Sequence, residues 1–90
     1  MMKRVHANVD GRVQGVGFRF HTQFLASEKN VTGWVRNKLD GTVEIEAQGD
    51  SNNIESFLSS VEQARFPAKV TSLKSKEIEL NDKEVKFSIR

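Results

Sequence analysis

The feature that most limits the possible folds is the way the spacing of apolar residues changes along the chain. Apolar and polar residues alternate in residues 5–10, 43–48 and 85–89, which predicts half-buried strands. In residues 54–61 the apolar positions follow the i, i+3, i+4, i+7 spacing of an amphipathic helix. The chain therefore combines strands and helices within 90 residues.

A further helix is expected over residues 20–30. Phe20 and Phe24 lie four positions apart with Leu25 beside them, which predicts a short apolar face on this helix. Asn30 is a plausible end for it. We expect Trp34 and the phenylalanines to be core or partly buried packing residues.

The remaining segments complete the predicted order. The pair Asp40-Gly41 separates two strand-like runs, residues 31–38 and 42–48, and predicts a hairpin. Residues 70–80 have mixed strand character. The order β-α-β-β-α-β, with a short final strand, predicts a ferredoxin-like α+β sandwich in which two helices cover one face of an antiparallel sheet.

Composition excludes several classes of protein. With no repeat or linker, residues 1–90 are expected to form a single domain. The absence of cysteine excludes a disulfide framework, a thiolate metal site and a cysteine nucleophile. No apolar run is long enough for a signal peptide or a membrane span, so we expect a cytoplasmic protein without a membrane partner. Without an obvious apolar stripe, a monomer is expected.

The stretch "GRVQGVGFRF", residues 11–20, joins the first strand to the first helix. It lacks the Gly-Lys-Ser/Thr of a Walker loop, and Phe20 stands where the dinucleotide fingerprint needs its third glycine. Two interpretations remain open: a tight turn, or a nest of backbone N–H groups that binds one anion. In the nest the donors belong to Gln14, Gly15, Val16, Gly17 and Phe18.

Arg19 follows this stretch and offers a guanidinium fork suited to phosphate oxygens. The expected helix descends about 16 Å at roughly 1.5 Å per residue. The next strand climbs back about 20 Å at roughly 3.3 Å per residue. Asn37 is therefore expected at the level of Arg19, at the carboxyl end of a strand running the same way as the first. A polar residue that merely prepares the hairpin is the alternative for Asn37.

Two stretches resemble the signatures of the acylphosphatase family. They are "VDGRVQGVGFR", Val9 to Arg19, and "GWVRNKLDGTVEIEAQG", Gly33 to Gly49. The resemblance implies an enzyme that hydrolyses acyl phosphates to carboxylate and inorganic phosphate, without a metal ion or cofactor. It implies that Arg19 is the phosphate-binding catalytic arginine, that Asn37 orients the attacking water, and that the loop N–H groups cradle the phosphate. Members of the family often end in an aromatic residue, whereas this chain ends at Arg90.

Two other functions use the same fold. An RNA-binding module would stack bases on aromatic residues of a central strand, but "TVEIEAQG" carries none, and a net charge of +2 does not favour nucleic acid. A catalytically silent phosphate-binding domain is the second alternative. His6, His21, Glu44 and Glu46 are candidate acids and bases that we expect to be surface residues instead.

Overall fold

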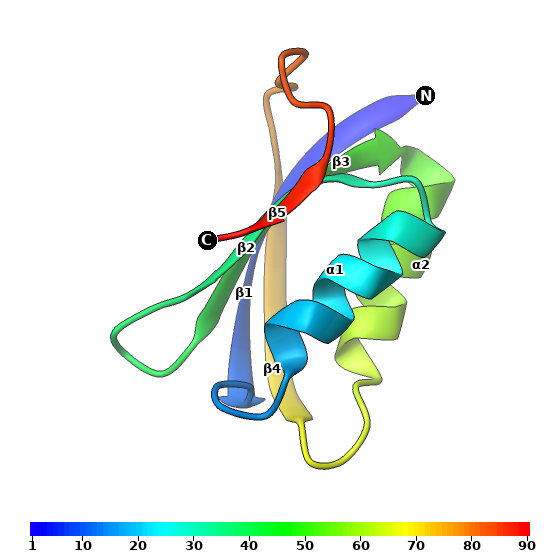
Figure 1. Cartoon of the computed structure of the whole chain (residues 1–90). Helices are drawn as coiled ribbons and strands as arrows, with labels where there is room; N and C mark the ends of the chain where they lie inside the picture. The colour runs from blue at the N-terminus through cyan, green and yellow to red at the C-terminus, as the bar shows by residue number, and fades with distance from the viewer.

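Five strands form one sheet, and both helices lie against the same face of it (Figure 1). The computed structural model describes the whole chain, Met1–Arg90. Its elements are β1 (Met2–Arg12), α1 (Phe18–Glu28), β2 (Thr32–Asn37), β3 (Val43–Asp50), α2 (Ser51–Glu62), β4 (Lys69–Ile78) and β5 (Phe87–Ile89). The predicted ferredoxin-like order is confirmed.

The strand order across the sheet is β4-β1-β3-β2-β5. Three of the pairings, β1 with β3, β1 with β4 and β2 with β3, are antiparallel as predicted. The fourth differs, because β5 runs parallel to β2 and makes the sheet mixed. A segment that crosses from β4 to the opposite edge of the sheet brings β5 in alongside β2.

The core lies between the sheet and the two helices. The alternating residues of β1 and β3 point into it, and α2 supplies the apolar face that its spacing predicts. The buried residues from these elements are Val5, Ala7, Val9, Val43, Ile45, Ala47, Ile54, Phe57, Leu58 and Val61. Asp50 caps α2, since its side chain accepts a hydrogen bond from the backbone N–H of Asn52.

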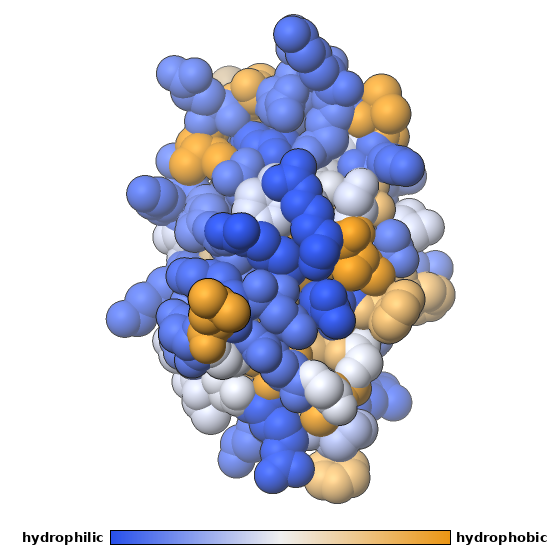
Figure 2. All heavy atoms as spheres, turned by 60° about the vertical axis from the view of Figure 1, so that its left-hand side comes forward, coloured by the Kyte–Doolittle hydropathy of each residue, from blue (hydrophilic) through white to orange (hydrophobic).

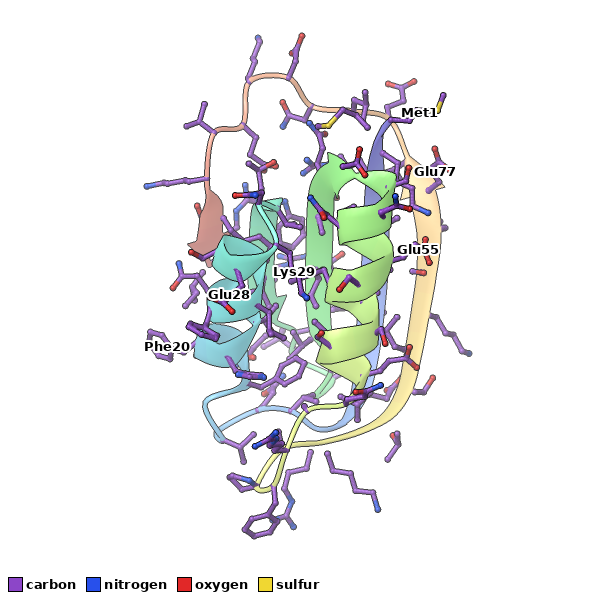
Figure 3. All side chains as sticks on the ribbon, turned by 90° about the vertical axis from the view of Figure 1, so that its right-hand side faces the viewer. Met1, Phe20, Glu28, Lys29, Glu55 and Glu77 are labelled. Carbon is purple, nitrogen blue, oxygen red and sulfur yellow. The ribbon has the colours of Figure 1, made fainter.

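The apolar face predicted for α1 is wrong. The helix begins at Phe18 and buries Phe18, Thr22 and Ala26, whereas Phe20 and Phe24 are 70% and 59% exposed. Phe20 projects away from α2 (Figure 3). Because the inward-facing Thr22 is polar, the pattern of apolar residues does not reveal this buried face. Its hydroxyl donates to the carbonyl of Phe18, so the polar group is satisfied inside the helix.

Two further packing expectations are wrong. Phe66 is 90% exposed, so three of the six phenylalanines lie at the surface. Val85 precedes β5 and is also exposed. Together with Phe20 and Phe24 it lines an open hollow of about 760 Å³ beside α1. The premise of the monomer prediction, that no apolar stripe stands out, therefore fails.

The face of the sheet away from the helices is largely hydrophilic (Figure 2). The one aromatic side chain of β2, Trp34, is only 8% exposed, and the guanidinium groups of Arg36 and Arg90 lie 5.7 and 4.6 Å from its ring. The central strands β1 and β3 contain no phenylalanine, tyrosine or tryptophan, and His6 of β1 is held by Glu44. Neither helix is long and apolar enough to cross a membrane.

Candidate active site

Residues 13–17, here called the glycine loop, connect β1 to α1 at one end of the sheet (Figure 1). Val13, the first residue of the loop, and Phe18, directly after it, are both almost completely buried. Gly15 and Gly17 have φ angles of 73° and 78°, in the left-handed region that favours glycine. Buried anchors and left-handed glycines together hold the loop in one tight path.

The loop presents backbone donors that the protein itself does not use. None of the N–H groups from Gln14 to Phe18 donates to a backbone carbonyl. They lead into the first turn of α1, where the helix dipole adds positive potential. A loop with alternating left-handed glycines and free N–H groups has the character of an anion-binding nest.

The side chain of Gln14 ties the loop to the β2–β3 hairpin. Its Nε2 donates to the carbonyl oxygens of Lys38 and Thr42, at 2.7 and 2.9 Å. The hairpin is itself closed by Asp40, whose carboxylate accepts from the backbone N–H and the hydroxyl of Thr42. These bonds, the hydroxyl first, lower the pKa of Asp40. The loop therefore lies beside the turn that follows Asn37.

Asn37 is the last residue of β2. Since β1 and β2 are both antiparallel to β3, they run in the same direction and end at the same edge of the sheet. The Oδ1 atom of Asn37 is buried and has no hydrogen-bond partner in the protein. A buried amide oxygen without a partner costs about 1–3 kcal/mol, so this atom is an acceptor that a donor from a water molecule or a ligand would satisfy.

Arg19 is partly buried in the first turn of α1. Its Nη1 donates to the carbonyl oxygen of Arg90 across a long 3.4 Å, and the N–H of Arg90 donates to the carbonyl of Val35 at 2.9 Å. Arg19 is thus connected, through Arg90, to a point in β2 two residues before Asn37. The bonds of Gln14 and Arg90 place the loop, Arg19 and Asn37 around one small region.

Three of the four other acid and base candidates, His6, Glu44 and Glu46, lie on the open face of the sheet. The ring of His6 and Nε of Arg36 each approach Glu44 at 2.6 Å on the open face of the sheet. The bond from His6, with a smaller contribution from Arg36, holds the pKa of Glu44 below its ordinary value although burial opposes the shift. Glu46 pairs with the buried guanidinium of Arg4. These contacts give the two glutamates a structural role.

His21 is exposed on α1, close to the glycine loop, and its side chain makes no hydrogen bond, although its backbone N–H donates to the carbonyl of Gly17 at 3.1 Å. No group of three or more histidine, cysteine, aspartate or glutamate side chains lies close enough together to hold a metal ion. Arg19, in the first turn of α1, brings a guanidinium group next to the glycine loop.

Sequence reasoning missed two contributors to this geometry. It considered only the backbone of Gln14, and it assigned no contact to Arg90. Both act through hydrogen bonds between residues 24 to 71 positions apart, which no local pattern of residue types reveals.

Comparison with known proteins decides the family. The acylphosphatase family model matches residues 5–89. The chain belongs to the acylphosphatase family. It is 46% identical over 88 residues to an acylphosphatase of Geobacillus thermodenitrificans, covering 98% of this chain and 94% of that protein. The predicted acylphosphatase enzyme, a hydrolase, is confirmed.

Solved structures of the family have the same fold. The crystal structure of acylphosphatase from Bacillus subtilis is 40% identical, covers 100% of this chain and 99% of that one, and has a TM-score of 0.93. An acylphosphatase from Coxiella burnetii is 32% identical, with a TM-score of 0.93 and coverage of 99% of this chain and 93% of that one.

Proposed function

We propose that this chain hydrolyses acyl phosphates to a carboxylate and inorganic phosphate, with Arg19 and the N–H groups from Gln14 to Phe18 binding the phosphate. Asn37 orients the attacking water. The observation that carries this proposal is the buried, unpartnered Oδ1 of Asn37 beside a loop whose N–H groups have no acceptor. One group is ready to accept from a water molecule, and the others are ready to donate to an anion.

The chemistry suits a site with so few side chains. The water oxygen forms a bond to phosphorus while the bond between phosphorus and the carboxyl oxygen breaks. The electron pair of the broken bond stays on the carboxyl oxygen, which leaves as carboxylate. A carboxylate is a good leaving group, so catalysis depends mainly on positioning and on stabilising negative charge. The loop donors and the Arg19 fork stabilise charge on the equatorial oxygens in the way an oxyanion hole does.

The proton of the attacking water needs an acceptor. The amide of Asn37 is not a base at neutral pH. His6 is paired with Glu44 on the open face, and His21 lines the hollow between the glycine loop and residues 64–68 rather than the hairpin side that carries Asn37. The phosphate of the substrate is the remaining acceptor, so we propose that the water proton passes to a phosphate oxygen. No cofactor or metal enters this scheme, and one copy of residues 1–90, acting as a single domain, supplies every group.

Acetyl phosphate hydrolysis by the purified protein tests the proposal. Arg19→Lys is expected to lose most of its activity because a point charge does not replace the bidentate fork, while the control Arg12→Lys on the exposed end of β1 keeps it. Asn37→Ala is expected to lower kcat far more than it raises KM, and Asn53→Ala on α2 serves as its control.

Four outcomes would contradict the proposal. Folded protein without turnover above the blank would refute the enzyme and leave the silent phosphate-binding domain. Wild-type rates in Arg19→Lys would refute the role of the fork, and an effect of Asn37→Ala on KM alone would refute water positioning. A chelator is expected to leave the rate unchanged; strong inhibition would show that a metal takes part.

A further inference from the structure

The largest hollow on the surface lies between α1 and β5 and has a volume of about 760 Å³. No residue of the glycine loop lines it, so it is separate from the candidate active site. Three of its lining side chains, Phe20, Phe24 and Val85, are apolar and 70%, 59% and 86% exposed. Phe20 projects away from α2 (Figure 3). Large apolar side chains gathered around one opening are typical of an interaction surface.

The strand beside this hollow, β5, packs against α1 at one edge of the sheet and has backbone groups that the fold does not use. The carbonyl of Lys86 and the N–H of Arg90 bond to β2. Because the backbone groups of a strand alternate in direction, those of Phe87 and Ile89 point to the outer side. The carbonyl of Phe87 accepts from the side chain of Gln23 of α1. The N–H groups of Phe87 and Ile89 and the carbonyl of Ile89 have no partner.

The two edges of the sheet differ in their protection against pairing with another chain. The strand at the other edge, β4, carries Lys69, Lys74 and Lys76, and lysines on an edge strand discourage such pairing. The three residues of β5 carry no charge. A free strand edge next to an apolar hollow is the arrangement that strand addition uses. Main-chain hydrogen bonds then supply affinity, and the hollow receives alternate side chains of the added strand.

The charges beside β5 indicate which kind of strand fits. Lys86 lines the hollow, Arg90 directly follows β5, and neither forms an ion pair. No acidic residue lines the hollow. Antiparallel pairing of β5 with β5 of a second copy, centred on Ser88, would place Lys86 opposite Arg90, and like charges in that position are destabilising. A strand with acidic side chains attracts both cations instead.

We propose that the hollow between α1 and β5 is a docking site for an extended segment of another protein, apolar at every second residue and acidic at the residues between. The segment adds to the outer edge of β5 as a further strand. Its apolar side chains lie on the helix side of the sheet, where Phe87 is buried, and enter the hollow. Its acidic side chains lie on the other face and attract Lys86 and Arg90. The proposed function is not required, because neither Arg19 nor Asn37 takes part.

A synthetic heptapeptide of alternating glutamate and leucine, followed by fluorescence anisotropy, tests the docking site. It is expected to bind the wild type, and the same peptide with lysine in place of glutamate is expected to bind about tenfold more weakly. Two further peptides carry N-methyl groups either on the leucines or on the glutamates. Because alternate N–H groups of a strand point to opposite edges, one of these peptides is expected to bind and the other is not.

Variants of the protein locate the bound peptide. Phe24→Gln is expected to weaken binding of the glutamate peptide about tenfold, since the peptide covers most of this side chain. Lys86→Glu is expected to weaken it severalfold at low salt and less at high salt. The matched controls are Phe66→Gln, a 90% exposed ring between α2 and β4, and Lys74→Glu at the other edge of the sheet. Both controls are expected to keep the affinity, and circular dichroism checks that each variant is folded.

Four results would overturn the proposal: no binding of the glutamate peptide, equal binding of the two N-methylated peptides, equal binding of the lysine peptide, or an equal effect of Phe66→Gln and Phe24→Gln. Analytical ultracentrifugation and vesicle binding test the other occupants. A dimer of the protein that Phe24→Gln abolishes would assign the hollow to a second copy. Binding to vesicles of anionic phospholipid that Phe24→Gln abolishes would assign it to a membrane surface, and either result would refute docking of a protein segment.

Discussion

Replacement of Gln14 by alanine tests whether the hairpin holds the glycine loop in place. The side chain makes two hydrogen bonds, of 2.7 and 2.9 Å, to the carbonyl oxygens of Lys38 and Thr42. Each such bond contributes about 0.5–1.5 kcal/mol, so their loss lowers the free energy of unfolding by about 2 kcal/mol. For a chain of this length, that loss corresponds to a decrease in Tm of about 8–16 °C.

Urea unfolding followed by circular dichroism measures the loss of stability, and acetyl phosphate kinetics measure its effect on the site. Gln23→Ala is the matched control, because this side chain makes one hydrogen bond, 3.1 Å to the carbonyl of Phe87, away from the hairpin. It is expected to lose about half as much stability and to keep its KM. Gln14→Ala is expected to raise KM, since its loop donors are no longer held beside Asn37.

A result within about 0.5 kcal/mol of the wild type for Gln14→Ala would refute this reasoning, because two lost bonds to partly buried carbonyls exceed that value. An equal rise in KM in both glutamine variants would refute the specific link between the loop and the hairpin. Urea unfolding and KM are measured independently, so the predicted loss of stability and the predicted rise in KM are tested separately.

Two more predictions concern the open face of the sheet. Arg4 is 2% exposed and pairs with Glu46 and Glu84. Arg4→Met leaves these two partly buried carboxylates without their cation, so it is expected to lower the free energy of unfolding by about 3 kcal/mol, measured with urea. An unchanged free energy of unfolding would refute this prediction. Because the folded-state pKa of Glu44 lies below its ordinary 4.5, its pairs stabilise the fold above that pH, and the contribution fades as pH falls through the folded pKa. Glu44→Gln is therefore expected to flatten the loss of stability below about pH 4.5, and an unchanged slope would contradict the assignment.

Patterns of a few neighbouring residues predicted the β2–β3 hairpin and α2 correctly. The Asp40-Gly41 turn and the apolar spacing of α2 both appear in the structure where the sequence places them. The α1 face failed because a threonine occupies an inward position and two phenylalanines occupy outward ones. Hydrophobicity alone does not distinguish a satisfied inward hydroxyl from an outward one.

The parallel pairing of β5 with β2 was missed for a different reason. Only three residues of β5 pair, and the chain reaches them after a long crossing from the far edge of the sheet. Alternation over so few positions indicates a strand but not its neighbour or direction. The contact of Arg90 with Arg19 depends on that pairing, so it was equally inaccessible to sequence reasoning.

The register of the hairpin explains why the position of Asn37 was nevertheless predictable. In β2 the side chains alternate, so Asn37 points to the same face as the buried Val35, two residues earlier. Its partner in β3 is Val43, directly after the turn. A shift of one residue would turn the charged Arg36 toward the loop and Asn37 toward the open face. The lengths of the helix and the strand predicted the level of Asn37, and the turn that closes the hairpin also sets the face to which its amide points.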